Sequence, residues 1–159
     1  MWRVVVMGVS GCGKSTFGAA LAQAAGAVFL DADDLHPPEN IARMAQGAPL
    51  SDADRWPWLA LCATAMARES RVVLACSALR RSYRDHLRAG VPGLRFVHMA
   101  ADQSTIAERL AQRRGHFMPP ALLDSQFATL EAPDAAEALI LPAFAPLEPA
   151  VRQALVALG

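Results

Sequence analysis

A glycine-rich loop near the start of the chain constrains the fold more than any other feature. Residues 8–15 read Gly-Val-Ser-Gly-Cys-Gly-Lys-Ser, which matches the pattern G-x-x-x-x-G-K-[ST]. The apolar segment Val4–Met7 precedes this loop, and Lys14–Ala25 follows it with helical periodicity and a stop at Gly26. A strand, such a loop and a helix form an anion site, because wrapped backbone N–H groups and the helix N-terminus both favour negative charge. The motif therefore predicts a phosphate-binding α/β fold.

The residues of this loop have separate expected roles. Lys14 is expected to reach the β- and γ-phosphates of a nucleotide, and the Ser15 hydroxyl is expected to bind Mg²⁺. Cys12 lies within the anion-binding loop at a helix N-terminus, so we expect an acidic thiol that can be modified and that a bound nucleotide shields. The loop residues predicted to bind the nucleotide are Gly8, Ser10, Gly11, Cys12, Gly13, Lys14, Ser15 and Thr16.

Short apolar segments alternate with longer helical segments along the rest of the chain. The predicted strands are Val4–Met7, Ala27–Leu30, Val72–Ala75, Arg95–Met99 and Ala138–Leu141. The predicted helices are Lys14–Ala25, Pro38–Ala45, Asp54–Glu69, Arg80–Ala89, Gln103–Arg113, Pro120–Leu130 and Leu147–Leu158. This alternation predicts one domain over residues 1–159, an α/β/α fold with a five-stranded parallel sheet. Ligands are expected at the carboxyl ends of the strands.

The composition excludes several classes of function. Fifteen basic and fifteen acidic residues give no net charge, which argues against nucleic acid as a partner. No apolar run approaches the roughly 18 residues that span a membrane, and we see no signal peptide. Three cysteines without a C-x-x-C pair fit a reducing cytoplasm and argue against a zinc site. The chain could act alone or as a homodimer.

Three carboxylates, Asp31, Asp33 and Asp34, follow the second predicted strand. At that place they could hold Mg²⁺ through water, or orient and deprotonate a substrate hydroxyl. The structural alternative is a cluster of acids at a helix N-terminus, where negative charge is favoured. His36, a few residues later, could bind a substrate or fill a turn or the core.

A single arginine, Arg55, lies in the first turn expected of the helix capped by Ser51 or Asp52. A cation at this place opposes the helix dipole, so it needs an anionic partner. That partner is either Asp52 or a carboxylate of the substrate.

The third predicted strand ends in small residues followed by cations. Ser77 lets a substrate approach the backbone, and Arg80 and Arg81 add positive charge at the same edge of the sheet. Arg84 and Arg88, further along, are expected on an exposed helix face.

A further group of arginines precedes a glycine and a proline-rich stretch. Arg109 and Arg113 share one helix face, and the segment of about residues 113–120 contains His116. This pattern predicts a lid that brings positive charge onto a γ-phosphate and excludes water. The alternative is a solvated cationic helix end.

Several segments resemble one family of small-molecule kinases. The chain resembles the gluconokinases, which are P-loop kinases related in fold to shikimate kinase and adenylate kinase. The resemblance covers roughly residues 4–133, and its most specific motifs are D-x-D-x-L-H-P at residues 31–37 and D-x-D-R-x-P-W-L at residues 52–59. It also includes residues 7–15, 76–79, 83–85 and 113–117, whereas residues 139–144 depart from the family pattern.

The resemblance implies transfer of phosphate from ATP to D-gluconate, giving 6-phospho-D-gluconate, with Mg²⁺ as the metal. It implies that Asp33 orients the hydroxyl, accepts its proton and helps Ser15 with the metal. Arg55, with Arg80 or Arg81, would hold the carboxylate of gluconate, because a planar guanidinium suits a carboxylate. The acceptor-binding residues implied are Asp33, His36, Arg55, Ser77, Arg80, Arg81 and His116. Lys14 and Arg113 would balance charge during transfer, and Arg109 and Arg113 would bind the nucleotide.

Two other functions stay open at this point. The chain could phosphorylate another small hydroxy acid or a nucleotide, since only the acceptor pocket would differ. It could also be a nucleotide-dependent switch without transfer activity. The sequence lacks an N-K-x-D segment that reads guanine, and a switch has no need of the acid cluster and lid.

Overall fold

Five parallel strands form one sheet in the order β2-β3-β1-β4-β5. The computed structural model describes residues 1–112 and 120–159. The strands are β1 Trp2–Met7, β2 Val28–Asp31, β3 Arg71–Ala75, β4 Leu94–Ala100 and β5 Leu139–Pro142. The helices are α1 Lys14–Ala25, the short 3-10 helix η1 Ala32–Leu35, α2 Pro38–Ala45, α3 Asp52–Ala67, α4 Arg81–Gly90, α5 Gln103–Gln112, α6 Pro120–Thr129 and α7 Leu147–Leu158.

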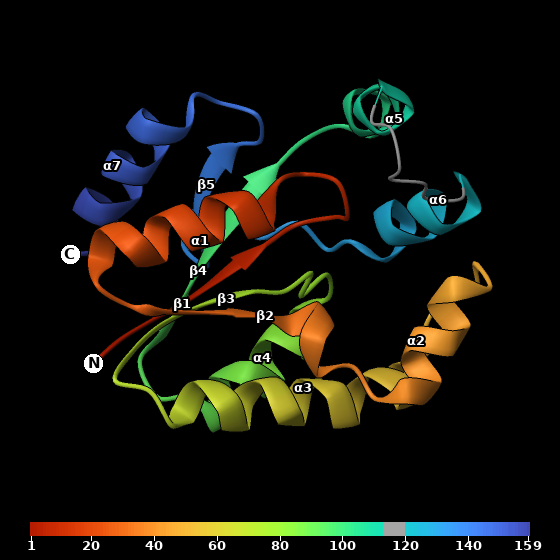
Figure 1. Ribbon diagram of the computed structural model, residues 1–159, viewed down its shortest axis with the longest axis horizontal. Coiled ribbons are helices and arrows are strands. Elements are labelled where there is room, and N and C mark those ends of the chain that lie inside the picture. The colour runs from red at the N-terminus through yellow and green to blue at the C-terminus, as the bar shows by residue number, and fades with distance from the viewer. Residues whose placement is uncertain (113–119) are drawn as a thin grey trace.

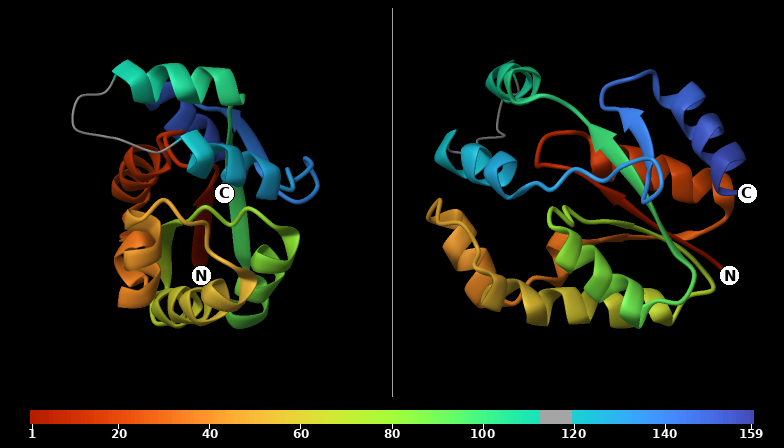
Figure 2. Two further views of the ribbon diagram at one scale, coloured as in Figure 1. Left: turned by 90° about the vertical axis from the view of Figure 1, so that its right-hand side faces the viewer. Right: turned by 180° about the vertical axis from the view of Figure 1, so that it is seen from behind.

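The helices form two layers over the sheet and a third group at its carboxyl edge. Helices α1 and α7 lie together on one face, and α3 and α4 lie together on the other (Figure 1). Helices α2, α5 and α6 lie beyond the carboxyl ends of the strands, as the views in Figure 2 also show. The predicted α/β/α fold with a five-stranded parallel sheet is therefore confirmed. The last strand joins β4 although its sequence departs from the expected pattern.

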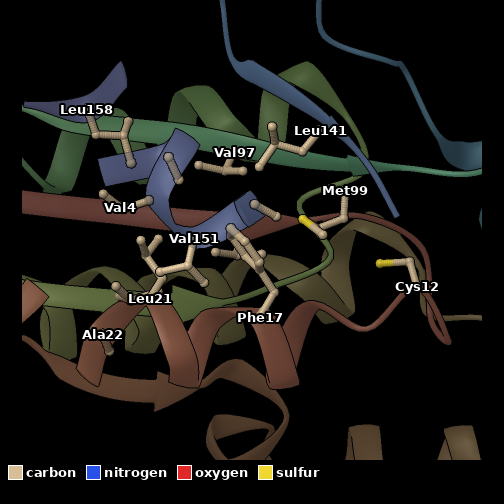
Figure 3. Packing of buried hydrophobic residues seen from close by; sticks show 14 of the residues in the cluster. Val4, Cys12, Phe17, Leu21, Ala22, Val97, Met99, Leu141, Val151 and Leu158 are labelled. Atoms are coloured by element: carbon tan, nitrogen blue, oxygen red, sulfur yellow. The ribbon is translucent and has the colours of Figure 1, made fainter. Parts of the chain in front are cut away.

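The apolar core consists of two clusters, one on each face of the sheet. Side chains of β1 alternate between them: Val4 and Val6 face the first cluster, and Val5 and Met7 face the second. The first cluster joins the sheet to α1 and α7 (Figure 3). A strand buried on both faces explains the continuous apolar run that predicted β1.

Glycine is required at two places in the loop that joins β1 to α1. A Cβ on Gly8 would lie 2.7 Å from the Cys12 sulfur and 3.0 Å from the Met99 carbonyl oxygen. Gly13 has a φ of 85° at the N-cap of α1, a conformation that costs other residues energy. The loop can therefore pass close to β4 and turn directly into the helix. Within residues 1–112 and 120–159, no helix is long and apolar enough to cross a membrane.

Candidate active site

One backbone amide of the phosphate-binding loop is hydrogen-bonded to a side chain that is distant in sequence. Ser10 N–H donates to the side-chain oxygen of Gln126, on α6, over 2.7 Å. Lys14 begins α1 and is partly exposed, so its ammonium group is open to a ligand. The predicted loop residues are thus placed together at the N-terminus of a helix, where an anion is favoured.

The loop is joined to the acid cluster by a direct hydrogen bond. Ser15 Oγ donates to Asp31 Oδ2 over 2.8 Å, and Asp33 N–H donates to Asp31 Oδ1 over 3.0 Å. A hydroxyl beside a carboxylate is an oxygen donor set that suits Mg²⁺. The carboxylate that bonds to Ser15 is therefore Asp31, whereas the sequence pointed to Asp33 as the partner of Ser15 at the metal. The sequence did contain a sign of this, because Asp31 is the last residue of β2 and so lies at the carboxyl edge of the sheet.

Arg55 is held in place by two neighbours near the start of α3. Its Nη1 donates to the Tyr83 hydroxyl over 2.9 Å and lies 4.0 Å from Asp52 Oδ1. Tyr83 in turn donates to Asp52 Oδ1 over 2.5 Å. The Arg55 side chain is only 13% exposed, and the one distance to Asp52 is long for an ion pair. Asp52 is therefore an anionic partner of Arg55, but most N–H donors of the Arg55 guanidinium remain available to another anion.

The side chain of His36 is packed against neighbouring side chains. Its ring stacks on Trp58 with centroids 4.0 Å apart, and the Asn40 amide nitrogen lies 3.2 Å from Nδ1. Burial lowers the pKa of His36 below its usual value, with the charge of Asp33 opposing this and that of Arg55 adding to it. His36 is therefore neutral at pH 7. Both charges act on it because Asp33 and Arg55 lie close by.

The two arginines that follow β3, Arg80 and Arg81, have different surroundings. The charge of Arg80 acts on the Tyr83 hydroxyl, whose pKa is raised chiefly by burial. Arg80 is therefore near the pair formed by Tyr83 and Arg55. Arg81 instead lines a separate cavity of about 890 Å³, together with Asp85 and Arg88. Of the two, Arg80 is therefore the better candidate to act together with Arg55.

The backbone after β3 is strained and lies against the phosphate-binding loop. Gly8 N–H donates to the Ser77 carbonyl oxygen over 3.3 Å. Ala78, the next residue, has a φ of 45°, a conformation that is rare without glycine. The backbone of Ser77 is thus placed against the phosphate-binding loop.

Arg84 is buried, so the expectation that it lies on an exposed helix face is wrong. Its side chain is 1% exposed, and all five N–H donors are used. Nε and Nη2 donate to the two carboxylate oxygens of Glu137 over 2.7 and 3.1 Å. The remaining donors bond the carbonyl oxygens of Ala78, Leu79 and Glu131 over 2.8–3.1 Å. Arg84 therefore fixes the strained loop after β3.

Arg88 was also expected to be exposed, and it too joins this network. Its Nη2 donates to Glu137 Oε2 over 2.5 Å, and its side chain is 30% exposed. Burial raises the pKa of Glu137, but the hydrogen bonds from Arg84 and Arg88 outweigh this effect and lower the pKa to about 2. No local pattern could reveal this partner, because Glu137 lies about fifty residues away in sequence.

A second cavity lies beside the phosphate-binding loop. It has a volume of about 450 Å³ and is lined by Gly11, Gly13, Thr16, Arg109 and Phe144, among others. The Arg109 guanidinium lies 3.9 Å from the centre of the Phe144 ring. The size suits a small organic ligand, and its walls join the phosphate-binding loop to α5 and the segment after β5. Thr16 and Arg109, both predicted for the nucleotide, are brought together here.

The prediction of an acidic, reactive Cys12 is contradicted. The residue is 1% exposed and belongs to the core cluster that includes Met99 (Figure 3). Burial raises the pKa of its thiol, and this outweighs the lowering effects of the Lys14 charge and the backbone amides. A buried neutral thiol is a poor nucleophile. The anion-binding loop therefore presents its backbone to the ligand while the Cys12 side chain fills the core.

Two predicted residues, Arg113 and His116, lie outside the described residues. The same holds for the expected lid over 113–120, apart from Pro120, which begins α6. Within the described ranges, no group of three or more His, Cys, Asp or Glu side chains could hold a metal by protein ligands alone. A metal at Ser15 and Asp31 would thus depend on further ligands from phosphate or water.

Comparison with known proteins gives one consistent family. The model of the family described as AAA domain matches residues 4–133. A gluconokinase of Gluconobacter oxydans is 49% identical over 141 residues, which cover 86% of this chain and 79% of that protein. The thermosensitive gluconokinase of Escherichia coli is 47% identical and is matched over 73% of its length.

Solved structures agree with the sequence relatives. A gluconokinase from Sinorhizobium meliloti superposes with a TM-score of 0.91 at 50% identity, over 99% of this chain and 91% of that one. A shikimate kinase from Aquifex aeolicus superposes with a TM-score of 0.70 at 15% identity, over 98% of this chain and 95% of that one. The second likeness concerns the fold alone.

Proposed function

Because this chain belongs to the gluconokinase family, we propose that it transfers the γ-phosphoryl group of ATP to a hydroxyl of D-gluconate, giving 6-phospho-D-gluconate and ADP. It is a P-loop phosphotransferase. The observation that carries the assignment of the acceptor is the family relationship, and it is supported by Arg55 and Asp33, whose charges both act on His36 from the acceptor side. Gluconate has one carboxylate and a hydroxyl at its far end, so it needs a cation and a proton acceptor separated by the length of the molecule.

The donor half of the site consists of the loop, Lys14 and the cavity beside the loop. Lys14 would neutralise charge on the β- and γ-phosphates as the phosphoryl group moves. Arg109 and Phe144 line the cavity where the base and ribose of ATP would bind. Ser15 and Asp31 would hold Mg²⁺, which when bound supplies further positive charge to the phosphates. Because transfer passes through a loose transition state, positioning and charge supply most of the catalysis.

The acceptor half consists of Asp33, the Arg55 cluster and the loop after β3. Asp33 is exposed at the carboxyl end of β2 and would accept the proton of the attacking hydroxyl. Arg55, preorganised by Tyr83, and Arg80 would hold the gluconate carboxylate. His36 supports this side of the site through its stack on Trp58, and Ser77 borders the path between the two halves. Arg113 and His116 stay predictions of the sequence.

An ADP-release assay with several acceptors tests this proposal. Gluconate should stimulate ATP consumption far more than shikimate or any nucleoside monophosphate, and 6-phosphogluconate should appear in equal amount to ADP. Lys14→Ala should lower kcat by about two to three orders of magnitude, because it removes a charge that acts on the transferring group. Equal turnover with another acceptor would reject gluconate as the substrate, and a lack of transfer to any acceptor would favour a nucleotide switch.

The setting of the reaction is also part of the proposal. We place the enzyme in the cytoplasm, which is supported by three cysteines that are all free thiols in the described residues. A homodimer is the open alternative to a monomer, and mass measurement in solution by light scattering distinguishes them.

A further inference from the structure

A side chain of helix α6 is hydrogen-bonded to the phosphate-binding loop. Gln126 Oε1 accepts the hydrogen bond of Ser10 N–H over 2.7 Å, across 116 residues of sequence. Both groups are partly buried, so water competes only in part for this bond. The bond uses an amide of the same loop that would hold the phosphates of ATP. The position of the loop therefore depends on the position of α6.

Glu131, two residues after the end of α6, is bonded just as directly to the segment after β3. Glu131 N–H donates to the Leu79 carbonyl oxygen over 2.8 Å, and Glu131 Oε1 accepts from Arg81 N–H over 3.0 Å. The Glu131 carbonyl oxygen accepts from Arg84 Nη2 over 2.8 Å. Three bonds thus attach one residue to the segment that borders the acceptor.

Helical hydrogen bonding continues through the chain between these two contacts. Leu130 N–H donates to the Gln126 carbonyl oxygen over 3.0 Å, so the helical bonding reaches the residue before Glu131. This short bonded segment provides a path by which a displacement of one contact would reach the other. The phosphoryl donor side and the acceptor side are linked through α6 as well as through the sheet.

We propose that Gln126 is a positioning residue, which sets the phosphate-binding loop relative to the acceptor-side loop during phosphoryl transfer. The proposal rests on the proposed function, because it concerns transfer between these two sides. A misplacement of about 1 Å between reacting groups lowers the rate about 100-fold, which makes such a link consequential. A neutral amide also suits this place, since a carboxylate beside the loop would repel the phosphates of ATP.

Two substitutions of Gln126 separate positioning from a structural role. Gln126→Leu removes the acceptor at similar size and should lower kcat about 10- to 100-fold, with KM for ATP and gluconate within about threefold of the wild type. Gln126→Glu keeps an oxygen acceptor but adds charge, so it should recover most of kcat while raising KM for ATP. Gln153→Leu, the same change at an exposed position of α7, should behave like the wild type.

A double variant tests whether the two contacts act through the same helix. Glu131→Ala removes the side-chain acceptor of Arg81 N–H just beyond the end of α6. If α6 links the two loops, Gln126→Leu combined with Glu131→Ala should lower kcat no further than the more severe single change. If the two residues act independently, their fold losses in kcat should multiply in the double variant, and that result would overturn the proposal.

Other outcomes also decide the question. If Gln126→Leu has normal kcat, or if its loss of activity only follows a lower melting temperature, Gln126 is a structural residue and the proposal is wrong. The wild type is first assayed with the acceptor panel. If gluconate fails and another acceptor is phosphorylated, the proposed function is wrong, and the same comparison of Gln126 variants is made with that acceptor.

Discussion

At the scale of single residues, Asp33 and Arg55 have different chemical tasks, so their variants should fail differently. Asp33→Asn removes the proton acceptor but keeps its shape, and it should lower kcat strongly while KM for ATP stays nearly unchanged. Arg55→Ala removes a carboxylate partner and should mainly raise KM for gluconate. A charged hydrogen bond contributes about 1.5–3 kcal/mol, which corresponds to a loss of about tenfold to 150-fold in kcat/KM.

Steady-state kinetics with both substrates varied measures these effects. Arg152→Ala, on an exposed position of α7, provides a control for the loss of an arginine. If Arg55→Ala leaves KM for gluconate unchanged and lowers only the melting temperature, the role of Arg55 is limited to its structural contacts with Tyr83 and Asp52. Binding of the carboxylate would then be assigned to Arg80.

The bond between Ser15 and Asp31 leads to a separate prediction for the metal. Asp31→Asn should raise the Mg²⁺ concentration needed for half-maximal activity by about 10- to 100-fold, as the loss of a group that supports a metal site commonly does. Asp33→Asn should raise it far less. Titration of activity with Mg²⁺ at saturating ATP distinguishes the two carboxylates. A larger effect at Asp33 would restore the assignment made from sequence.

At the scale of elements, the start of α3 connects stability with substrate binding. Ser51 caps the helix by accepting the Asp54 N–H over 3.2 Å, and Asp54 accepts the Ser51 N–H over 2.9 Å. Ser51→Ala should cost about 1 kcal/mol of stability, or roughly 2–4 °C in melting temperature. Because Arg55 lies in the next turn, KM for gluconate should rise as well. Thermal unfolding and kinetics should show neither change for Ser82→Ala, which alters an exposed serine on α4.

Local sequence patterns predicted the bounds of the helices more accurately than they predicted the contacts between elements. The bounds of α1, α2 and α7 agree with the prediction, because capping residues and helical periodicity are local signals. Helix α3 begins two residues earlier than expected, since Ser51 forms the cap. The burial of Arg84 and the ion pair of Arg88 were missed, because both depend on a distant carboxylate. The bond from Ser10 to Gln126 is equally invisible to a local pattern.

At the scale of the whole molecule, the order of strands explains why distant motifs meet. The carboxyl ends of β1, β2 and β3 are adjacent in the sheet, so the phosphate-binding loop, the acid cluster and the loop after β3 converge. Sequence reasoning predicted this convergence from the fold class alone. It could not choose between Arg80 and Arg81, because the direction of each side chain depends on how α4 packs against its neighbours.

The bonds of Glu137 to Arg84 and Arg88 join α4 to the segment before β5, and their contribution to folding should depend on pH. Since the folded pKa of Glu137 is about 2 and the ordinary value is 4.5, the contribution is complete above about pH 4.5 and is lost as pH falls toward 2. The size of this shift corresponds to a contribution on the order of 3 kcal/mol.

Glu137→Gln should therefore be less stable than the wild type by about 3 kcal/mol or more at pH 7, because Arg84 stays buried without its anion. The difference should narrow below about pH 4.5, because there the unfolded wild type binds a proton at Glu137 that the folded protein, with a pKa of about 2 for this group, does not bind. Urea unfolding at a series of pH values measures this difference directly. Glu148→Gln, which removes an exposed charge on α7, should show no such convergence with the wild type. A constant gap between Glu137→Gln and the wild type down to pH 3 would mean that the carboxylate charge is not what stabilises this junction.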